Sequence, residues 1–137
     1  MPMDYGWLQP YPPGAVVSVW RGFYHHVALL AEAPPGFERR VISLNPGPPG
    51  TQLREETVSE FARGKEVVVR STPRVLHPHW VLARARSGQH PPYSWLEFNC
   101  DHFVRFAHGV PVESPQLQAW VAVGLLGAVL LALGGRS

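Results

Sequence analysis

Residues 93–109 read YSWLEFNCDHFVRFAHG, and this stretch decides the fold. Asn99 suits a helix N-cap, because its side-chain oxygen can accept a hydrogen bond from a backbone N–H that the first turn leaves unpaired. Gly109 is typical of the residue that follows a helix. Apolar residues stand three, four and seven positions after Cys100, namely Phe103, Val104 and Ala107. This spacing predicts a helix that starts near Asn99 and packs on a sheet with the face that carries Cys100.

The preceding part of the chain contains short apolar runs separated by proline- and glycine-rich turns. Such runs are typical of strands. The predicted strands cover residues 15–19, 27–31, 39–44 and 65–70. Further helices are predicted over residues 55–63, with Gly64 as the cap, and from Pro78 to Gly88. Strands with helices beside them indicate the α+β class.

The composition of the 137 residues limits the kind of protein. Hydrophobic residues make up 45% and charged residues 16%, which is enough apolar material for one globular core. One cysteine excludes a disulfide framework and a four-cysteine zinc site. A formal charge of +2 is compatible with an anionic membrane surface but does not indicate nucleic-acid binding. Residues 1–13 lack the apolar run of a secretory signal, so we expect an N-terminal extension there.

The C-terminal residues 114–135 contain no charged side chain, and residues 119–133 read AWVAVGLLGAVLLAL. As a helix these 22 residues would span roughly 33 Å, and a bilayer core needs about 30 Å. Trp120 suits one interface and Arg136 the other. We therefore expect a single-pass membrane anchor over residues 114–137, with residues 117–135 in the membrane and the preceding domain on the cytosolic side. The alternative is a buried or interfacial helix.

Cys100 is a candidate nucleophile, because unpaired N–H groups and the helix dipole at a helix start favour a thiolate. The alternative is a small buried hydrophobe. A thiol nucleophile needs a base, usually histidine. His25 and His26 open an apolar run, and strand alternation directs one of them toward the helix with Cys100. The other histidines are expected to be structural: His77, His79, His90, His102 and His108.

Other chemistries find little support in the sequence. A zinc site built from Cys100, His102, His77 and His79 would match no established ligand spacing. The sequence contains no phosphate-binding loop and no paired carboxylates placed for acid–base catalysis. We expect no metal and no cofactor.

Two motifs resemble those of the lecithin:retinol acyltransferase-like family, which includes small phospholipase A/acyltransferases. Residues 99–104, NCDHFV, resemble the family's Asn-Cys-Glu-His-Phe box, and residues 22–28, GFYHHVA, resemble its histidine box. The resemblance extends from about Gly14 to Leu133. It implies a circularly permuted papain-like (NlpC-type) domain over residues 14–113, with an antiparallel sheet packed by helices. It also implies that the C-terminal hydrophobic helix is a membrane anchor.

The resemblance further implies a role for each matching residue. Cys100 matches the nucleophile and His26 the general base. The third polar position, commonly histidine in the family, is occupied by Ser43, and Asn45 is a possible substitute on the same strand face. Backbone N–H groups at the helix start, near Asn99 and Cys100, would hold the oxyanion. The implied activity is acyl transfer or hydrolysis of membrane lipid esters through a cysteine thioester, of the phospholipase A1/A2 kind.

Two alternatives remain open at this point. The same pair of residues would serve a papain-like peptidase or amidase. The second alternative is a non-catalytic membrane adaptor that retains the fold. Ser43, in place of the family's third polar residue, favours this alternative.

Overall fold

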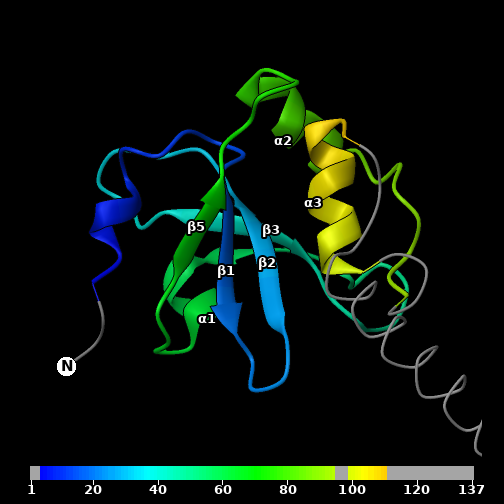
Figure 1. Ribbon diagram of the computed structural model, residues 1–137, viewed down its shortest axis with the longest axis horizontal. Coiled ribbons are helices and arrows are strands. Elements are labelled where there is room, and N and C mark those ends of the chain that lie inside the picture. Colours follow the sequence, from blue (N-terminus) through cyan, green and yellow to red (C-terminus); the bar gives the residue numbers. More distant parts are fainter. Residues whose placement is uncertain (1–3, 95–98, 111–137) are drawn as a thin grey trace, which may run out of the picture.

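The computed structural model describes residues 4–94 and 99–110. A five-stranded antiparallel sheet has the strand order β4-β3-β2-β1-β5 (Figure 1). Its strands are β1 (Val16–Trp20), β2 (His25–Leu30), β3 (Arg40–Leu44), β4 (Leu53–Thr57) and β5 (Val68–Ser71). The helices are the short 3-10 helix η1 (Gly6–Leu8), α1 (Val58–Ala62), α2 (Pro78–Arg86) and α3 (Cys100–His108). The predicted α+β class and the antiparallel sheet with helices packed on it are confirmed.

The two faces of the sheet bury different cores, because alternate residues of a strand point to opposite sides. Val27 and Leu29 of β2 belong to a cluster with Cys100 and Phe103 of α3, together with residues of α2. On the other face, residues of β1 and β2 pack with α1 and with the N-terminal segment, in a cluster that includes Val17, Ala28, Leu30, Phe61 and Leu8. Figure 1 shows α2 beside α3, and α3 beside β2 and β3. The sheet thus forms the middle layer, with α3 on one face and α1 on the other.

The predicted helix over residues 55–63 is wrong in its first part. Leu53–Thr57 is the edge strand β4, which pairs with β3 from Arg40↔Thr57 to Leu44↔Leu53. Thr57 then caps α1, because its hydroxyl accepts a hydrogen bond from the Glu60 N–H and the Glu60 carboxylate accepts one from the Thr57 N–H. The helix therefore begins only at Val58, because residues 53–57 pair with β3, a contact that the local sequence does not reveal.

The other predicted elements exist with shifted boundaries. β2 begins at His25, so both histidines of the pair lie within the strand. β5 begins at Val68, three residues later than predicted. Tyr5 and Leu8, in the predicted N-terminal extension, are buried in the core on the α1 face.

The predicted membrane segment, residues 114–137, lies outside the described residues. In the described part of the chain, no helix combines the length and the apolar character that a membrane crossing requires.

Candidate active site

The start of α3 is fixed by a reciprocal cap, in which Asn99 is the N-cap that the sequence predicts. The side-chain oxygen of Asn99 accepts hydrogen bonds from the N–H groups of Asp101 (3.0 Å) and His102 (3.2 Å). In return, the imidazole Nδ1 of His102 accepts the Asn99 N–H at 3.1 Å. His102 is therefore a capping residue, in agreement with its expected structural role. The cap holds Cys100 rigidly at the first position of the helix.

The Cys100 thiol is buried against the backbone at the start of β2. Its Sγ lies 3.9 Å from the carbonyl oxygen of His25, and it also interacts with the backbone of Val27. The ladder between β2 and β3 pairs Leu29 with Ile42 and Leu30 with Val41. The thiol thus lies beside the part of β2 that precedes this pairing, next to the backbone of His26.

Burial raises the pKa of the Cys100 thiol to about 11. The Asp101 carboxylate also raises this pKa, whereas hydrogen bonds from the backbone of Val27, Asp101 and Cys100 lower it. The expectation of a thiolate favoured by the helix start is therefore wrong for this arrangement. The backbone N–H groups do act in the expected direction, but removal of the sulfur from water outweighs them. At neutral pH the thiol is protonated.

His26 is buried on the face of the sheet that packs against α1. Its ring centroid lies 5.3 Å from that of Phe61 and 6.2 Å from that of Tyr24. Burial lowers the imidazole pKa to about 4, and the nearby charges of Arg21 and Arg63 lower it further. His26 is therefore neutral at neutral pH, which is the form that a general base requires.

Asn45 and Ser43 form a chain of polar contacts that ends at His26. The Asn45 side chain hydrogen-bonds the His26 ring and favours its protonated form. The Asn45 Nδ2–H in turn donates to the Ser43 hydroxyl oxygen at 2.8 Å. Ser43 is fully buried. Of the two candidates for the third position, Asn45 contacts the imidazole directly and Ser43 supports Asn45.

Cys100 and His26 meet the same stretch of β2 from different sides. Cys100 belongs to the core on the α3 face, and His26 contacts Phe61 on the α1 face. Within residues 4–94 and 99–110, no hydrogen bond joins the Cys100 thiol to an imidazole. Proton transfer from Cys100 to His26 therefore needs either a side-chain movement that brings the two groups into contact or a bridging group between them.

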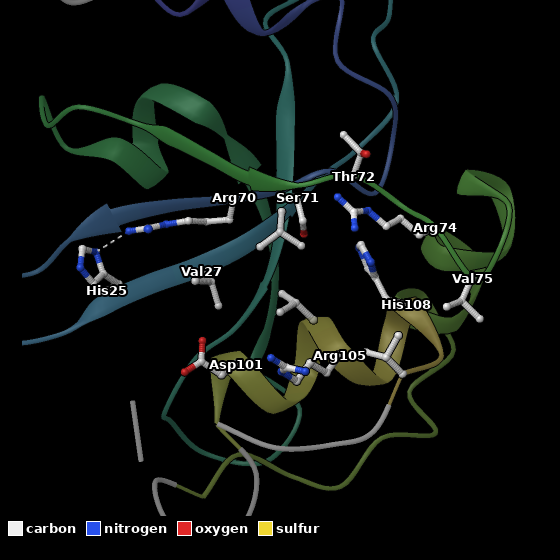
Figure 2. Close-up of a pocket in the computed structure, with 13 residues that line it drawn as sticks. His25, Val27, Arg70, Ser71, Thr72, Arg74, Val75, Asp101, Arg105 and His108 are labelled. Carbon is white, nitrogen blue, oxygen red and sulfur yellow. Dashed lines mark hydrogen bonds between the residues drawn. The ribbon is translucent and has the colours of Figure 1, made fainter. Parts of the chain in front are cut away.

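His25 is the member of the pair on the α3 face. It lines a cavity together with Arg70 and Asp101 (Figure 2). Its Nδ1 lies 3.2 Å from Nη2 of Arg70, and its ring packs against Trp20 at a centroid distance of 4.9 Å. The His25 ring thus takes part in a different polar cluster, although its carbonyl oxygen contacts the thiol.

Two tyrosines near the thiol were missed by the sequence reasoning. Burial raises the pKa of Tyr24, and it raises that of Tyr93 to about 12. In both cases the negative charge of an ionised Cys100 adds to the increase, so both phenols lie within electrostatic range of the sulfur. Both remain protonated at neutral pH and can donate a hydrogen bond. The alternation that places Tyr24 on the face of His26 is the only sequence signal, and Tyr93 has none.

Two further histidines, His77 and His108, have structural contacts. His77 is the N-cap of α2 and accepts the His79 N–H at 3.1 Å. His108 is buried, and its Nε2 lies 2.7 Å from the carbonyl oxygen of Gly14. The suggested zinc ligands are not brought together, because no group of three or more His, Cys, Asp or Glu side chains in the described residues could hold a metal ion.

A comparison with models of known protein families finds no match for this chain. A comparison with curated proteins finds no significantly similar sequence. The functional interpretation therefore depends on the residues at the start of α3 and on β2 and β3.

Proposed function

We propose that the protein is a cysteine-dependent acyltransferase or acyl hydrolase that acts on lipid esters. Cys100 is the nucleophile and His26 the general base. The observation that carries the proposal is the position of the chain's single thiol. It is fixed by a capped helix start beside the strand segment that bears a neutral imidazole in contact with Asn45.

The reaction begins from an uncharged pair. After a side-chain movement brings His26 to the thiol, its imidazole takes the Cys100 proton while Sγ attacks the ester carbonyl carbon. The oxyanion then collapses, the C–O bond breaks, and the leaving alcohol receives the proton from His26. The acyl group remains on Sγ as a thioester. Water, an amine or a lysolipid hydroxyl then attacks the thioester with His26 again as the base, and the free thiol is restored.

Donors near the sulfur can stabilise the oxyanion. The backbone N–H of Cys100 lies at the helix start, where the helix itself supplies no acceptor. The protonated phenols of Tyr24 and Tyr93 add two further donors in the same region. Such preorganised donors contribute most when they are shielded from water, and Tyr24 and Tyr93 are both half-buried.

The order of the elements supports a circularly permuted papain-like fold. The strand with His26 comes first, the strand that leads to Asn45 follows, and the helix with Cys100 comes last. A Cys-His-Asn group serves papain-like proteases, and the hydrogen bond between the Asn45 side chain and His26 supports a similar role for Asn45.

The proposed substrate class depends on the predicted anchor. Residues 114–137 would hold the domain at a membrane, on the cytosolic side, where lipid esters are concentrated. The second candidate is a peptidase or amidase, and the contact between Asn45 and His26 favours it for the reason just given.

The test uses the full chain in phosphatidylcholine vesicles, with fatty acid release and acyl transfer to a labelled amine as the readouts. We expect Cys100→Ala to abolish both activities and His26→Gln to reduce them by about 100-fold or more. His79→Gln is the matched control, because His79 is exposed on α2 and lies outside the site. Ester cleavage that survives Cys100→Ala would overturn the proposal. Cleavage of peptide amides in preference to lipid esters would favour the second candidate.

A further inference from the structure

A cavity of about 510 Å³ lies between α3 and the sheet, on the side of β1, β2 and β5. Its polar lining includes Arg70 from β5, Arg74 from the segment that follows, and Arg105 from α3. Figure 2 shows Arg70 and Arg74 on the strand side of this space and Arg105 on the helix side. The Cys100 thiol does not line the cavity, which lies between α3 and the strands β1, β2 and β5.

The lining of the cavity carries an excess of positive charge. Three arginines line it, and Asp101 is the only carboxylate among its lining residues in the described part of the chain. The described partners of Arg70 are the Ser18 hydroxyl at 2.8 Å and Nδ1 of His25 at 3.2 Å, neither of which is an anion. Arg74 makes no hydrogen bond or ion pair with any residue in the described ranges.

Arg86, in contrast, is an arginine whose charge is neutralised by neighbouring carboxylates. Arg86 forms ion pairs with both Glu32 (2.7 Å) and Glu55 (2.6 Å). Arg70 and Arg74 have no such carboxylate partner among the described residues. A concave site with uncompensated guanidinium groups attracts an anion, and the planar guanidinium suits the oxygen atoms of phosphate.

The rest of the lining is apolar. Val16, Val27 and Val104 are buried and form its floor, and Val75 is 62% exposed beside Arg74. A ligand that fills this cavity therefore needs an anionic group and an apolar part. Free inorganic phosphate would bind the arginines but would leave the apolar part of the lining without a contact.

We propose that this cavity binds the phosphate group of an amphiphilic phosphoester. The headgroup of an anionic phospholipid is the source that the position of the cavity favours. Val110 lines the cavity, and the predicted anchor enters the membrane at residue 117. Seven residues span at most about 25 Å when fully extended, so an anchored chain would keep the cavity within about that distance of the bilayer. The proposal does not depend on catalysis by Cys100.

The test compares binding of the full chain to phosphatidylcholine vesicles with and without phosphatidic acid, by vesicle flotation. The predicted anchor contributes equally to both kinds of vesicle, so the preference for phosphatidic acid is the readout. We expect the wild type to prefer it, and we expect this preference to fall roughly fivefold for each of Arg74→Gln and Arg105→Gln. Arg54→Gln is the matched control, because Arg54 is exposed on β4, at the opposite edge of the sheet. Thermal unfolding of each variant checks that it folds.

A second arm titrates the full chain in detergent micelles with glycerol 3-phosphate. Saturable binding that the cavity variants weaken, without any vesicle preference, would assign the phosphate site to a soluble phosphoester. A vesicle preference that only the cavity variants weaken would assign it to a lipid headgroup. If Arg74→Gln and Arg105→Gln match Arg54→Gln in both arms, the cavity is not a phosphate site and the proposal is overturned.

Discussion

Cys100 and His26 are both uncharged at neutral pH, and burial is the main cause for each. It raises the pKa of the thiol to about 11 and lowers that of the imidazole to about 4. The resting site is therefore not a thiolate–imidazolium ion pair. The proton must leave the sulfur as the bond to the substrate forms, and this requires contact between the two side chains or a bridging group between them.

The reactivity of Cys100 toward a small alkylating agent should reflect its raised pKa. Iodoacetamide reacts with the thiolate, so the rate in the full chain is expected to rise with pH beyond pH 9 without a plateau near neutrality. Asp101→Asn should shift this profile to lower pH, because the Asp101 carboxylate raises the thiol pKa. Lys65→Gln, an exposed position that affects the pKa of neither Cys100 nor His26, serves as the control. A plateau with a midpoint below pH 7 would contradict the uncharged resting site.

At the scale of one element, α3 positions the nucleophile through its first turn. The Asn99 side chain accepts two backbone hydrogen bonds, and the Asn99 N–H donates one to Nδ1 of His102. Phe103 and Ala107 then fix the rotation of the helix, because both are fully buried. The position of Cys100 thus follows from a cap and an apolar face, both of which are encoded locally.

Loss of this cap should destabilise the domain. Asn99→Ala removes the acceptor for the N–H groups of Asp101 and His102, and such a change typically costs about 1 kcal/mol, up to about 2. Asn99→Asp retains an acceptor and should cost less. Urea unfolding of the two variants and the wild type measures the difference. Equal stability of Asn99→Ala and the wild type would show that the cap does not hold the helix.

The same element explains what could be predicted from the sequence. Both ends of α3 are determined by local residues, namely the N-cap Asn99 and the C-cap Gly109, which adopts a φ of 72°. β4 was missed because Glu55 and Glu56 suit a helix locally, whereas their backbone pairs with β3. The pKa values of Cys100 and His26 were not predictable either, since burial depends on residues distant in the sequence.

Across the whole molecule, Arg39 ties the N-terminal segment to the sheet. Its guanidinium is buried and donates to the carbonyl oxygens of Ala31 (2.8 Å), Leu8 (3.1 Å), Gln9 (3.3 Å) and Tyr11 (2.9 Å). These acceptors belong to two separate chain segments. The N-terminal residues are therefore part of the fold on the α1 face.

Replacement of Arg39 should be strongly destabilising. Arg39→Met leaves several buried carbonyl groups without this donor, and one such loss alone costs about 1–3 kcal/mol. We expect a total loss of at least about 3 kcal/mol in the free energy of unfolding. Arg40→Met is the matched control, because Arg40 is exposed and its guanidinium donates to the Glu55 carbonyl at 2.7 Å. Similar losses for the two variants in chemical denaturation would contradict the role of Arg39.

The stability of the whole domain should also depend on pH through His26. Its pKa in the folded state is about 4, below the ordinary 6.5, so the unfolded chain binds the additional proton between these values. The contribution is therefore fully present above pH 6.5 and is lost as the pH falls toward 4, by about 3 kcal/mol in total. Unfolding measured across this range should show a shallower pH dependence for His26→Gln than for the wild type. An unchanged slope would indicate that His26 is not buried as described.

The most direct test of the central claim, that Cys100 is an acyl-accepting nucleophile served by His26, is intact-mass spectrometry of the full chain after brief incubation with an activated fatty acyl ester. The account predicts one acyl adduct, sensitive to hydroxylamine, located on Cys100 and absent in Cys100→Ala. It also predicts that the adduct forms much more slowly in His26→Gln than in His79→Gln. No adduct on the wild type, or an adduct that forms equally fast in His26→Gln, would contradict the account and favour the non-catalytic adaptor.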